Sequence, residues 1–210
     1  ANPLDGRLYI LMDNDLLHLD DQASKKIIDI ELGINGSSLA IDDTQNRLLI
    51  GTHYGRILSR SLIDSSEQAD LLNWNEDTPV DAITVDDQGI IWFVSDCELH
   101  YIAPGQSTLS TTNFCSSDLP ESPIDIAVIS DTVYIATSES GVRVIEYSTS
   151  TDSSGISVTI GSNTQWSTGN SLTSNTISQL QVVDSLLLIS TIGGGVNRYD
   201  ISSDSWLATW

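Results

Sequence analysis

One short phrase of apolar residues recurs five times along the chain, and each copy gives way to a small or polar residue and then to a turn. The runs are rich in β-branched, leucine and aromatic residues, which favour strands. The copies occupy residues 8–11, 48–52, 92–96, 133–137 and 187–191, so their first residues lie 40, 44, 41 and 54 positions apart. This spacing is too long for hairpins alone and indicates a repeated unit of several strands.

The other strands of each unit can be assigned around the phrase. From the second copy onward a strand that ends near an aspartate precedes it, and an alternating strand and a fourth strand follow. Inner strands are apolar without interruption, as expected for burial on both faces, whereas outer strands alternate or turn polar. The pattern predicts an all-β fold, a β-propeller of about five four-stranded blades. As one domain, its blades occupy residues 1–35, 36–78, 79–122, 123–174 and 175–210.

The first unit has room for three strands only, near residues 7–12, 15–20 and 25–32. With four strands in each of the other four units, the chain has nineteen strands, and the first blade lacks its innermost one. That edge would expose unpaired backbone groups. We favour a compact five-bladed ring, and two alternatives stay open: further blades outside this segment, or a strand lent by a neighbouring subunit.

The last unit carries the most specific pattern, because residues 190–200 read STIGGGVNRYD and Trp206 follows. Residues 86–93 and 49–55 are two shorter pieces of the same kind. The unit resembles the two-component-regulator propeller repeat, whose phrases run close to LWIGT and GGGLNRYD. The resemblance implies a propeller, and in bacteria often a periplasmic sensor module that binds glycans or peptides. The first and third units depart from the repeat in their turns, where other residues replace the glycines.

The run Gly193–Gly195 has two interpretations. A phosphate-binding loop would need a Lys-Ser/Thr pair and a following helix, and the sequence has neither. We therefore expect a tight turn between strands that needs positive φ.

The charge is strongly acidic, with 29 acidic residues against 8 basic ones and a net charge of −21. Such a field repels nucleic acid and anionic lipid, so we expect neither as a partner, and it suits divalent cations, basic partners or solubility. No apolar run approaches the roughly 18 residues of a transmembrane helix. The start at Ala1, without a signal pattern, suits a processed mature protein or an excised domain.

The two cysteines, Cys97 and Cys115, flank a strand pair with a turn at residues 104–106. Antiparallel pairing about that turn brings position 97 opposite 114 or 115, within disulfide reach. We predict a disulfide, with two separate half-buried thiols as the alternative. A disulfide implies an oxidising place outside the cytoplasm: extracellular, cell-surface or periplasmic. Catalytic cysteine chemistry is not expected, since no basic group recurs beside either residue.

Aspartates recur in the turns between first and second strands, which gather on one face of a propeller. A ring of carboxylates there could bind Ca²⁺. We favour the simpler interpretation, in which each aspartate caps its own turn, and expect no other cofactor. The candidate calcium ligands are Asp42, Asp43, Asp86 and Asp87.

The opposite face collects the turns between second and third strands, where aromatic residues and carboxylates could hold sugars or basic peptides. The three histidines fall in three different blades, so we expect packing roles rather than a metal site or a catalytic triad. No Gly-x-Ser-x-Gly elbow and no distinctive pair of carboxylates is present. The candidate ligand-face residues are Asp13, His53, Tyr54, Asp96, Glu139 and Gly194.

A stretch rich in Ser, Thr, Gly and Asn, residues 148–175, accounts for the longest spacing. It is either an extended outer hairpin or an irregular insertion, and its functional interpretation is a contact arm for a partner. Together these features predict a non-enzymatic extracellular binding or scaffold propeller with protein or glycan partners. One alternative is a subunit of a self-assembling surface layer or filament with strand pairing between subunits. The other is a polysaccharide lyase or hydrolase.

Overall fold

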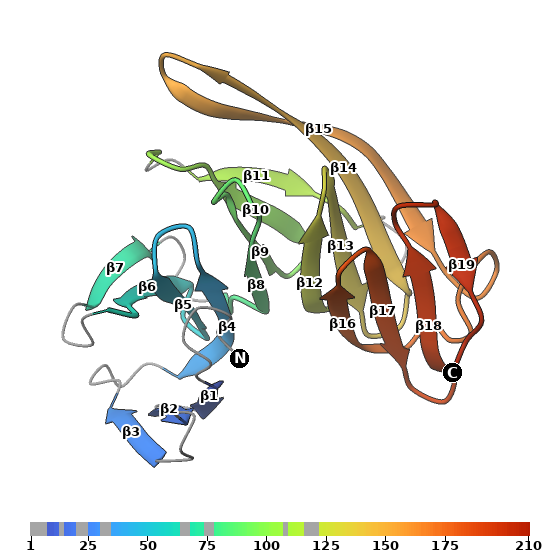
Figure 1. The fold of residues 1–210 in the computed structure, drawn as a ribbon, viewed down its shortest axis with the longest axis horizontal. Helices are drawn as coiled ribbons and strands as arrows, with labels where there is room; N and C mark the ends of the chain where they lie inside the picture. Colours follow the sequence, from blue (N-terminus) through green and yellow to red (C-terminus); the bar gives the residue numbers. More distant parts are fainter. Residues whose placement is uncertain are drawn as a thin grey trace. The chain divides into compact units, whose positions relative to one another are not determined.

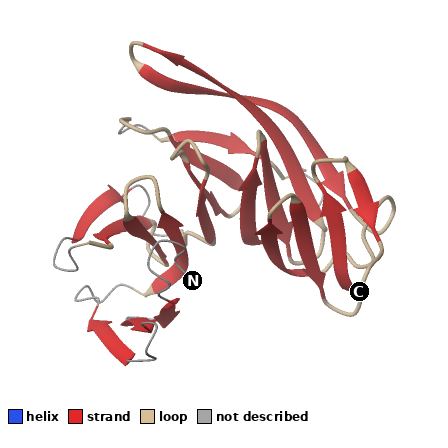
Figure 2. Ribbon diagram, in the orientation of Figure 1, coloured by secondary structure: helices blue, strands red, loops and turns tan. Residues whose placement is uncertain are grey.

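The computed structural model describes residues 8–12, 15–19, 25–29, 35–63, 68–73, 78–106, 109–115 and 122–210. Within these ranges the regular structure consists of nineteen strands in five sheets, as the sequence predicts (Figures 1 and 2). The described residues contain no helix long and apolar enough to cross a membrane. The chain divides into two compact units, residues 1–89 and 90–210.

The first unit holds a three-stranded sheet and a four-stranded sheet. The first sheet has the order β1-β2-β3, with β1 Leu8–Met12, β2 Asp15–Leu19 and β3 Lys25–Asp29. The second has the order β4-β5-β6-β7, with β4 Gly36–Asp42, β5 Arg47–Thr52, β6 Arg56–Ser61 and β7 Gln68–Asn73. β8, Ala82–Val85, follows and contacts β4. Among the described residues, the first sheet therefore has the three strands that the sequence predicts.

The second unit holds the strands from β9 onward. The third sheet has the order β8-β9-β10-β11, in which β8 belongs to residues 1–89 and β9 Ile91–Ser95, β10 Glu98–Ile102 and β11 Ser110–Asn113 belong to the second unit. The fourth has the order β12-β13-β14-β15, with β12 Pro123–Ile129, β13 Thr132–Thr137, β14 Val142–Asp152 and β15 Gly155–Trp166. The fifth has the order β16-β17-β18-β19, with β16 Ile177–Val183, β17 Leu186–Thr191, β18 Gly195–Asp200 and β19 Ser205–Leu207.

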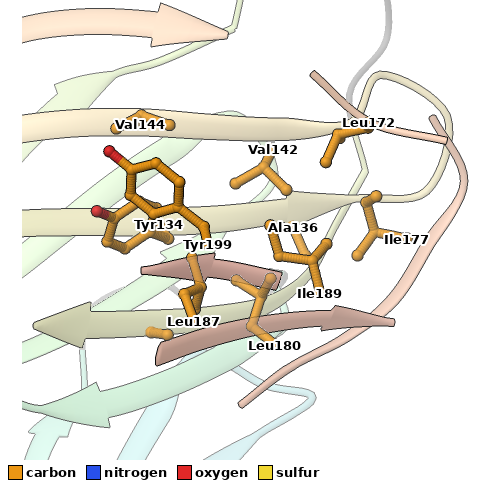
Figure 3. Close-up of a cluster of buried hydrophobic side chains, with 11 residues drawn as sticks. Tyr134, Ala136, Val142, Val144, Leu172, Ile177, Leu180, Leu187, Ile189 and Tyr199 are labelled. Carbon is orange, nitrogen blue, oxygen red and sulfur yellow. The ribbon is translucent and has the colours of Figure 1, made fainter. Parts of the chain in front are cut away.

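Four of the five recurring phrases form the second strands of the four-stranded sheets, and the first forms β1. All five residues of β9 are buried, and five of the six in β5 and in β13 are buried as well. Between the fourth and fifth sheets, Tyr134 and Ala136 pack with Leu187 and Ile189 (Figure 3). Burial on both faces explains why these segments are apolar without alternation.

The first strands of three sheets carry an irregularity at the same place. The register shifts between Gly36 and Ser38 in β4, between Pro123 and Asp125 in β12, and between Ile177 and Gln179 in β16. Such a bulge re-aims the side chains beside it. Two of them bond outside their own strand pair: the Ser38 hydroxyl donates to the carbonyl of Val80, two residues before β8, over 2.9 Å, and the Asp125 carboxylate accepts from the N–H of Leu180 in β16 over 2.7 Å.

Candidate functional site

The turns between second and third strands are called the b–c turns below, and in three of the described ones a threonine hydroxyl makes hydrogen bonds within the turn. The Thr137 hydroxyl donates to the Gly141 carbonyl over 2.9 Å and accepts from the N–H of Ser140 over 3.0 Å. The Thr191 hydroxyl donates to the Gly195 carbonyl over 2.8 Å. In β5 the Thr52 hydroxyl accepts the N–H groups of Tyr54 and Arg56 instead. Thr52 and Thr137 are fully buried at the ends of β5 and β13, so these two turns are anchored in the core, whereas Thr191 is only partly buried at the end of β17.

Glycines with positive φ complete the frame. Gly55, Gly141 and Gly195 have φ values of 63°, 87° and 79°. A Cβ atom at Gly141 would lie 2.1 Å from the carbonyl oxygen of Trp166, and one at Gly195 would lie equally close to that of Trp210. Gly193, at φ 81°, also adopts this conformation, which confirms the expectation of a tight turn at Gly193–Gly195.

The side chains that this frame presents differ from turn to turn. In the first unit, His53 and Tyr54 are exposed, Tyr54 to 49%. In the second unit, Asp96 and Glu139 are exposed, as is Ile192 to 64%. Gly194 lies in the same turn as Ile192, and its carbonyl accepts the Thr173 hydroxyl over 2.7 Å.

Five of the six predicted ligand-face residues are described, two in the first unit and three in the second, and Asp13 lies outside the described residues; that they form a ligand face stays a prediction. Sequence reasoning missed Ile192 and the threonine frame. Two features of the sequence could have revealed them. Three of the five phrases end in threonine, and an isoleucine stands alone between Thr191 and Gly193.

A disulfide joins Cys97 and Cys115, with 5.3 Å between their Cα atoms, which confirms the predicted bond. Cys97 follows Asp96 in the b–c turn of the third sheet, where Asp96 takes φ 50°. The N–H of Phe114 donates to the Cys97 carbonyl over 3.1 Å, which extends the β10–β11 pairing up to the bond. The disulfide thus ties this turn, which lacks a glycine, to the outer strand of its sheet.

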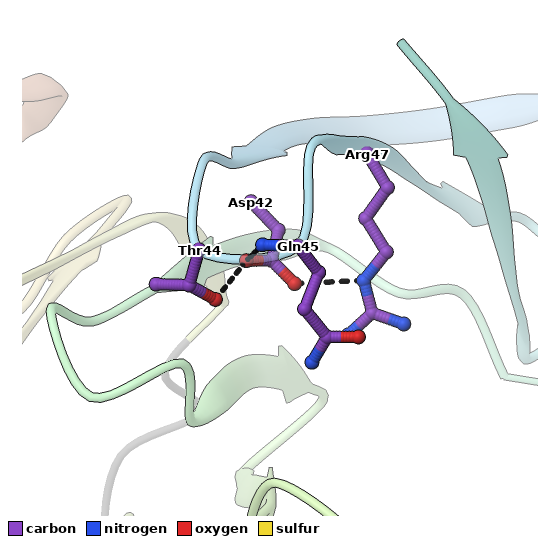
Figure 4. Close-up of polar contacts among 4 residues, drawn as sticks. All are labelled: Asp42, Thr44, Gln45 and Arg47. Carbon is purple, nitrogen blue, oxygen red and sulfur yellow. Dashed lines mark hydrogen bonds and ion pairs between the residues drawn. The ribbon is translucent and has the colours of Figure 1, made fainter. Parts of the chain in front are cut away.

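The candidate calcium ligands lie in turns that their own carboxylates stabilise. Asp42 is fully buried and accepts from the Thr44 hydroxyl at 2.6 Å, the Gln45 N–H at 3.1 Å and the Arg47 guanidinium at 2.7 Å (Figure 4). Buried Asp86 accepts the N–H of Gln88 over 3.0 Å. These are the contacts of aspartates that cap turns.

Asp43 and Asp87, which follow Asp42 and Asp86 in sequence, are exposed. Among the described residues no three His, Cys, Asp or Glu side chains come together as a metal would require. The guanidinium of Arg47 already neutralises Asp42. Calcium binding stays a prediction, and these contacts give it no support.

His100 lies inside the third sheet, where its ring stacks on Phe93 with 4.7 Å between centroids. Its Nδ1 is 2.9 Å from the Thr111 hydroxyl, across the β10–β11 pair. Burial lowers the pKa of His100 to about 4, so the ring is neutral at physiological pH. This is the cross-strand packing that the sequence suggests for the histidines.

A second ionisable group with a shifted pKa is Asp125, which is half-buried on β12. Burial raises the pKa of its carboxyl, although the N–H groups of Leu180 and Ile126 that it accepts act in the opposite direction. Both hydrogen bonds are to the backbone, at 2.7 and 2.9 Å, so the side chain serves the architecture.

The Ser/Thr-rich stretch begins as an extended outer hairpin, one of its two predicted forms. Its strands β14 and β15 have 11 and 12 residues and run past the other strands of their sheet (Figure 1). Trp166 anchors the base, with its ring 4.6 Å from that of Tyr199 and 4.9 Å from that of Trp206. The arm is therefore an ordered part of the second unit.

The chain matches no protein-family model and no curated protein sequence. Similar solved structures include BamB from Moraxella catarrhalis, at 10% identity and TM-score 0.56 over 96% of this chain and 62% of that one. The WD40 β-propeller domain of Doa1 matches at 15% identity and TM-score 0.64, over 98% of this chain and 65% of that one. The chain has a β-propeller fold.

A third similar structure is the extracellular domain of a hybrid two component system from B. thetaiotaomicron. It matches at 16% identity and TM-score 0.54, over 97% of this chain and 34% of that domain. At these identities the likeness shows the fold alone. The chain spans less than two thirds of each of these three proteins. The resemblance of the last unit to the two-component-regulator propeller repeat stays a prediction.

Proposed function

We propose that this propeller is a non-enzymatic binding module that works outside the cytoplasm and holds a protein or glycan partner at its b–c turns. The observation that carries the proposal is the combination of a repeated frame with unlike exposed side chains. Thr137 and Thr191 make the same hydroxyl-to-carbonyl bond, yet their turns present Glu139 and Ile192. Loops held by a rigid scaffold and differing in side chain are where folds of this kind place recognition.

The chemistry of the turns favours a partner that offers both hydroxyl or cationic groups and apolar surface. The carboxylate of Glu139 accepts hydrogen bonds and attracts basic groups. In the same unit, Ile192 adds exposed apolar surface. Sugars and basic peptides combine both properties, since each has polar groups around a carbon framework.

The location rests on the disulfide between Cys97 and Cys115. Such bonds form and persist in oxidising compartments and are rare in the cytosol. A binding module outside the cell or in a periplasm is consistent with this bond and with the strongly acidic composition.

A screen of the full chain on glycan and peptide arrays, followed by product analysis of each bound compound, tests the proposal. Glu139→Lys should abolish binding to the selected compound. Asp131→Lys is the matched control, because Asp131 is an exposed acid on the same sheet, in the turn at the opposite end of β13. Equal effects of the two variants, or release of product from the bound compound, would refute a non-enzymatic b–c turn site.

A further inference from the structure

The outer edge of β15 is unusual among the outermost strands of the described sheets. β15 has 12 residues, none of them ionisable and none proline, whereas β7, β11 and β19 have 6, 4 and 3. It ends its sheet, and within the described ranges it pairs with β14 alone. Natural edge strands are kept short, charged or interrupted, because a long neutral edge accepts strands from other chains.

The register shows which backbone groups of β15 point outward. Asp152 and Gly155 flank the two-residue turn of the hairpin and form its closing hydrogen-bonded pair. Pairs along an antiparallel ladder alternate, so the outward groups belong to every second residue from there. On this side of the register shift they are Ile156, Val158 and Ile160.

Two hydrogen bonds agree with that assignment. The Gln106 amide donates to the carbonyl of Ile156 over 3.1 Å, from outside the hairpin. The N–H of Tyr147, which lies opposite Ile160, donates to the Asp131 carbonyl over 2.9 Å and thus points away from β15. Gln106 donates an N–H to an outward carbonyl of β15, and an added strand would donate its backbone N–H groups in the same way along the rest of this edge.

The two faces beside the edge differ in chemistry. The side chains of Ile156, Val158 and Ile160 are half-buried, and those of Ser157 and Thr159 are exposed. A strand added here would lay alternate residues over an apolar row and over a row of small hydroxyl groups. The small row leaves room for long side chains.

The charge of this unit indicates which long side chains a partner strand would carry. Residues 90–210 contain twelve Asp and Glu and two Arg, with no Lys. Asp152 is exposed on β14, one strand in from the edge, on the same face as Ser157 and Thr159. Long basic side chains crossing the hydroxyl row would approach it. A second copy of this chain would instead bring another charge of −21, which opposes association.

We propose that the β15 edge at Val158 and Ile160, beyond the Ile156 carbonyl that Gln106 already occupies, binds an extended partner strand in which basic and apolar residues alternate. This site is separate from the b–c turns. The proposal therefore does not depend on whether those turns bind a ligand.

A short fluorescent peptide of alternating lysine and valine, titrated into the full chain, tests the proposal. Its control is the same peptide with alternate backbone nitrogens methylated, which keeps the charge and removes strand hydrogen bonding. We expect the control to bind at least about tenfold more weakly. Val158→Pro should weaken binding of the first peptide to a similar degree, because proline removes an outward N–H that β14 does not use. Val158→Thr, which keeps the N–H and the branched shape, should bind like the original.

Hydrogen exchange gives a readout that does not depend on the proline variant folding. The amides of Val158 and Ile160 should exchange more slowly when the first peptide is bound. Equal affinity for the two peptides would overturn the proposal in favour of attraction by surface charge alone. A dimer of the unliganded chain that Val158→Pro abolishes would overturn it in favour of a second copy as the occupant.

Discussion

The carboxylate of Asp125 accepts a hydrogen bond from the backbone N–H of Leu180, which lies 2.7 Å away and 55 residues further along the chain. The bond joins the first strand of one sheet, β12, to the first strand of the next, β16. Asp125 is able to reach because the bulge between Pro123 and Asp125 turns its side chain out of the regular alternation. In the first unit Ser38 makes the corresponding contact to Val80 from the same place in β4. The bulge in β12 therefore couples the fourth sheet to the fifth.

Asp125→Ala should lower the free energy of unfolding by about 1–3 kcal/mol, because it leaves the N–H of Leu180 without its acceptor. Gln179→Ala is the matched control, since Gln179 follows the equivalent bulge in β16 and is exposed. The control should change stability by no more than about 0.5 kcal/mol. Urea denaturation of both variants measures the difference, and equal effects would mean that the bond to Leu180 contributes nothing.

Acid should destabilise the protein in part through His100. Its pKa of about 4 in the folded chain lies below the ordinary value of 6.5, so the unfolded chain binds the proton more tightly between these values. Stability is therefore complete above pH 6.5 and is lost as the pH falls toward 4, by at most about 3 kcal/mol. The unfolding free energies of wild type and His100→Gln should diverge across this range in denaturation experiments. Parallel curves would show that His100 titrates normally.

Removal of the disulfide by replacing Cys97 and Cys115 with serine should cost about 3 kcal/mol, since the bond closes a short loop in the unfolded chain. The two positions are 18 residues apart. The double variant should have a lower urea midpoint than the oxidised protein, and reductant should lower the midpoint of wild type only. A reductant-insensitive wild type with the same midpoint as the variant would contradict the bond.

Alanine substitutions at two glycines distinguish the cost of backbone strain from the cost of a steric clash. Gly105 and Gly141 have φ values of 76° and 87°, but a Cβ at Gly105 would meet nothing within 4 Å, whereas one at Gly141 would lie 2.1 Å from the Trp166 carbonyl oxygen. Gly105→Ala should cost about 1 kcal/mol from strain alone. Gly141→Ala should cost clearly more in thermal denaturation, and similar losses would mean that the b–c turn accommodates a side chain.

The sequence was sufficient for the repeat, the strands and the disulfide, because each depends on local pattern or on pairing about one turn. Asp42 and Asp86 show where it was ambiguous: an aspartate after a strand looks the same whether it caps a turn or binds a cation, and only the positions of Thr44 and Arg47 distinguish the two. Asp125 could not have been singled out, since its partner is the backbone of a distant strand and leaves no trace in side-chain pattern. The outward groups of β15 depend on hairpin register, which composition does not fix.

The central claim, that the b–c turns are where this propeller recognises its partner, is tested most directly by amide hydrogen exchange with and without the compound selected on the arrays. We expect protection to increase at residues 53–55 or at 96, 138–140 and 192–194, and to stay unchanged in the turns at residues 43–46, 130–131 and 184–185. Protection confined to this second group would contradict the account.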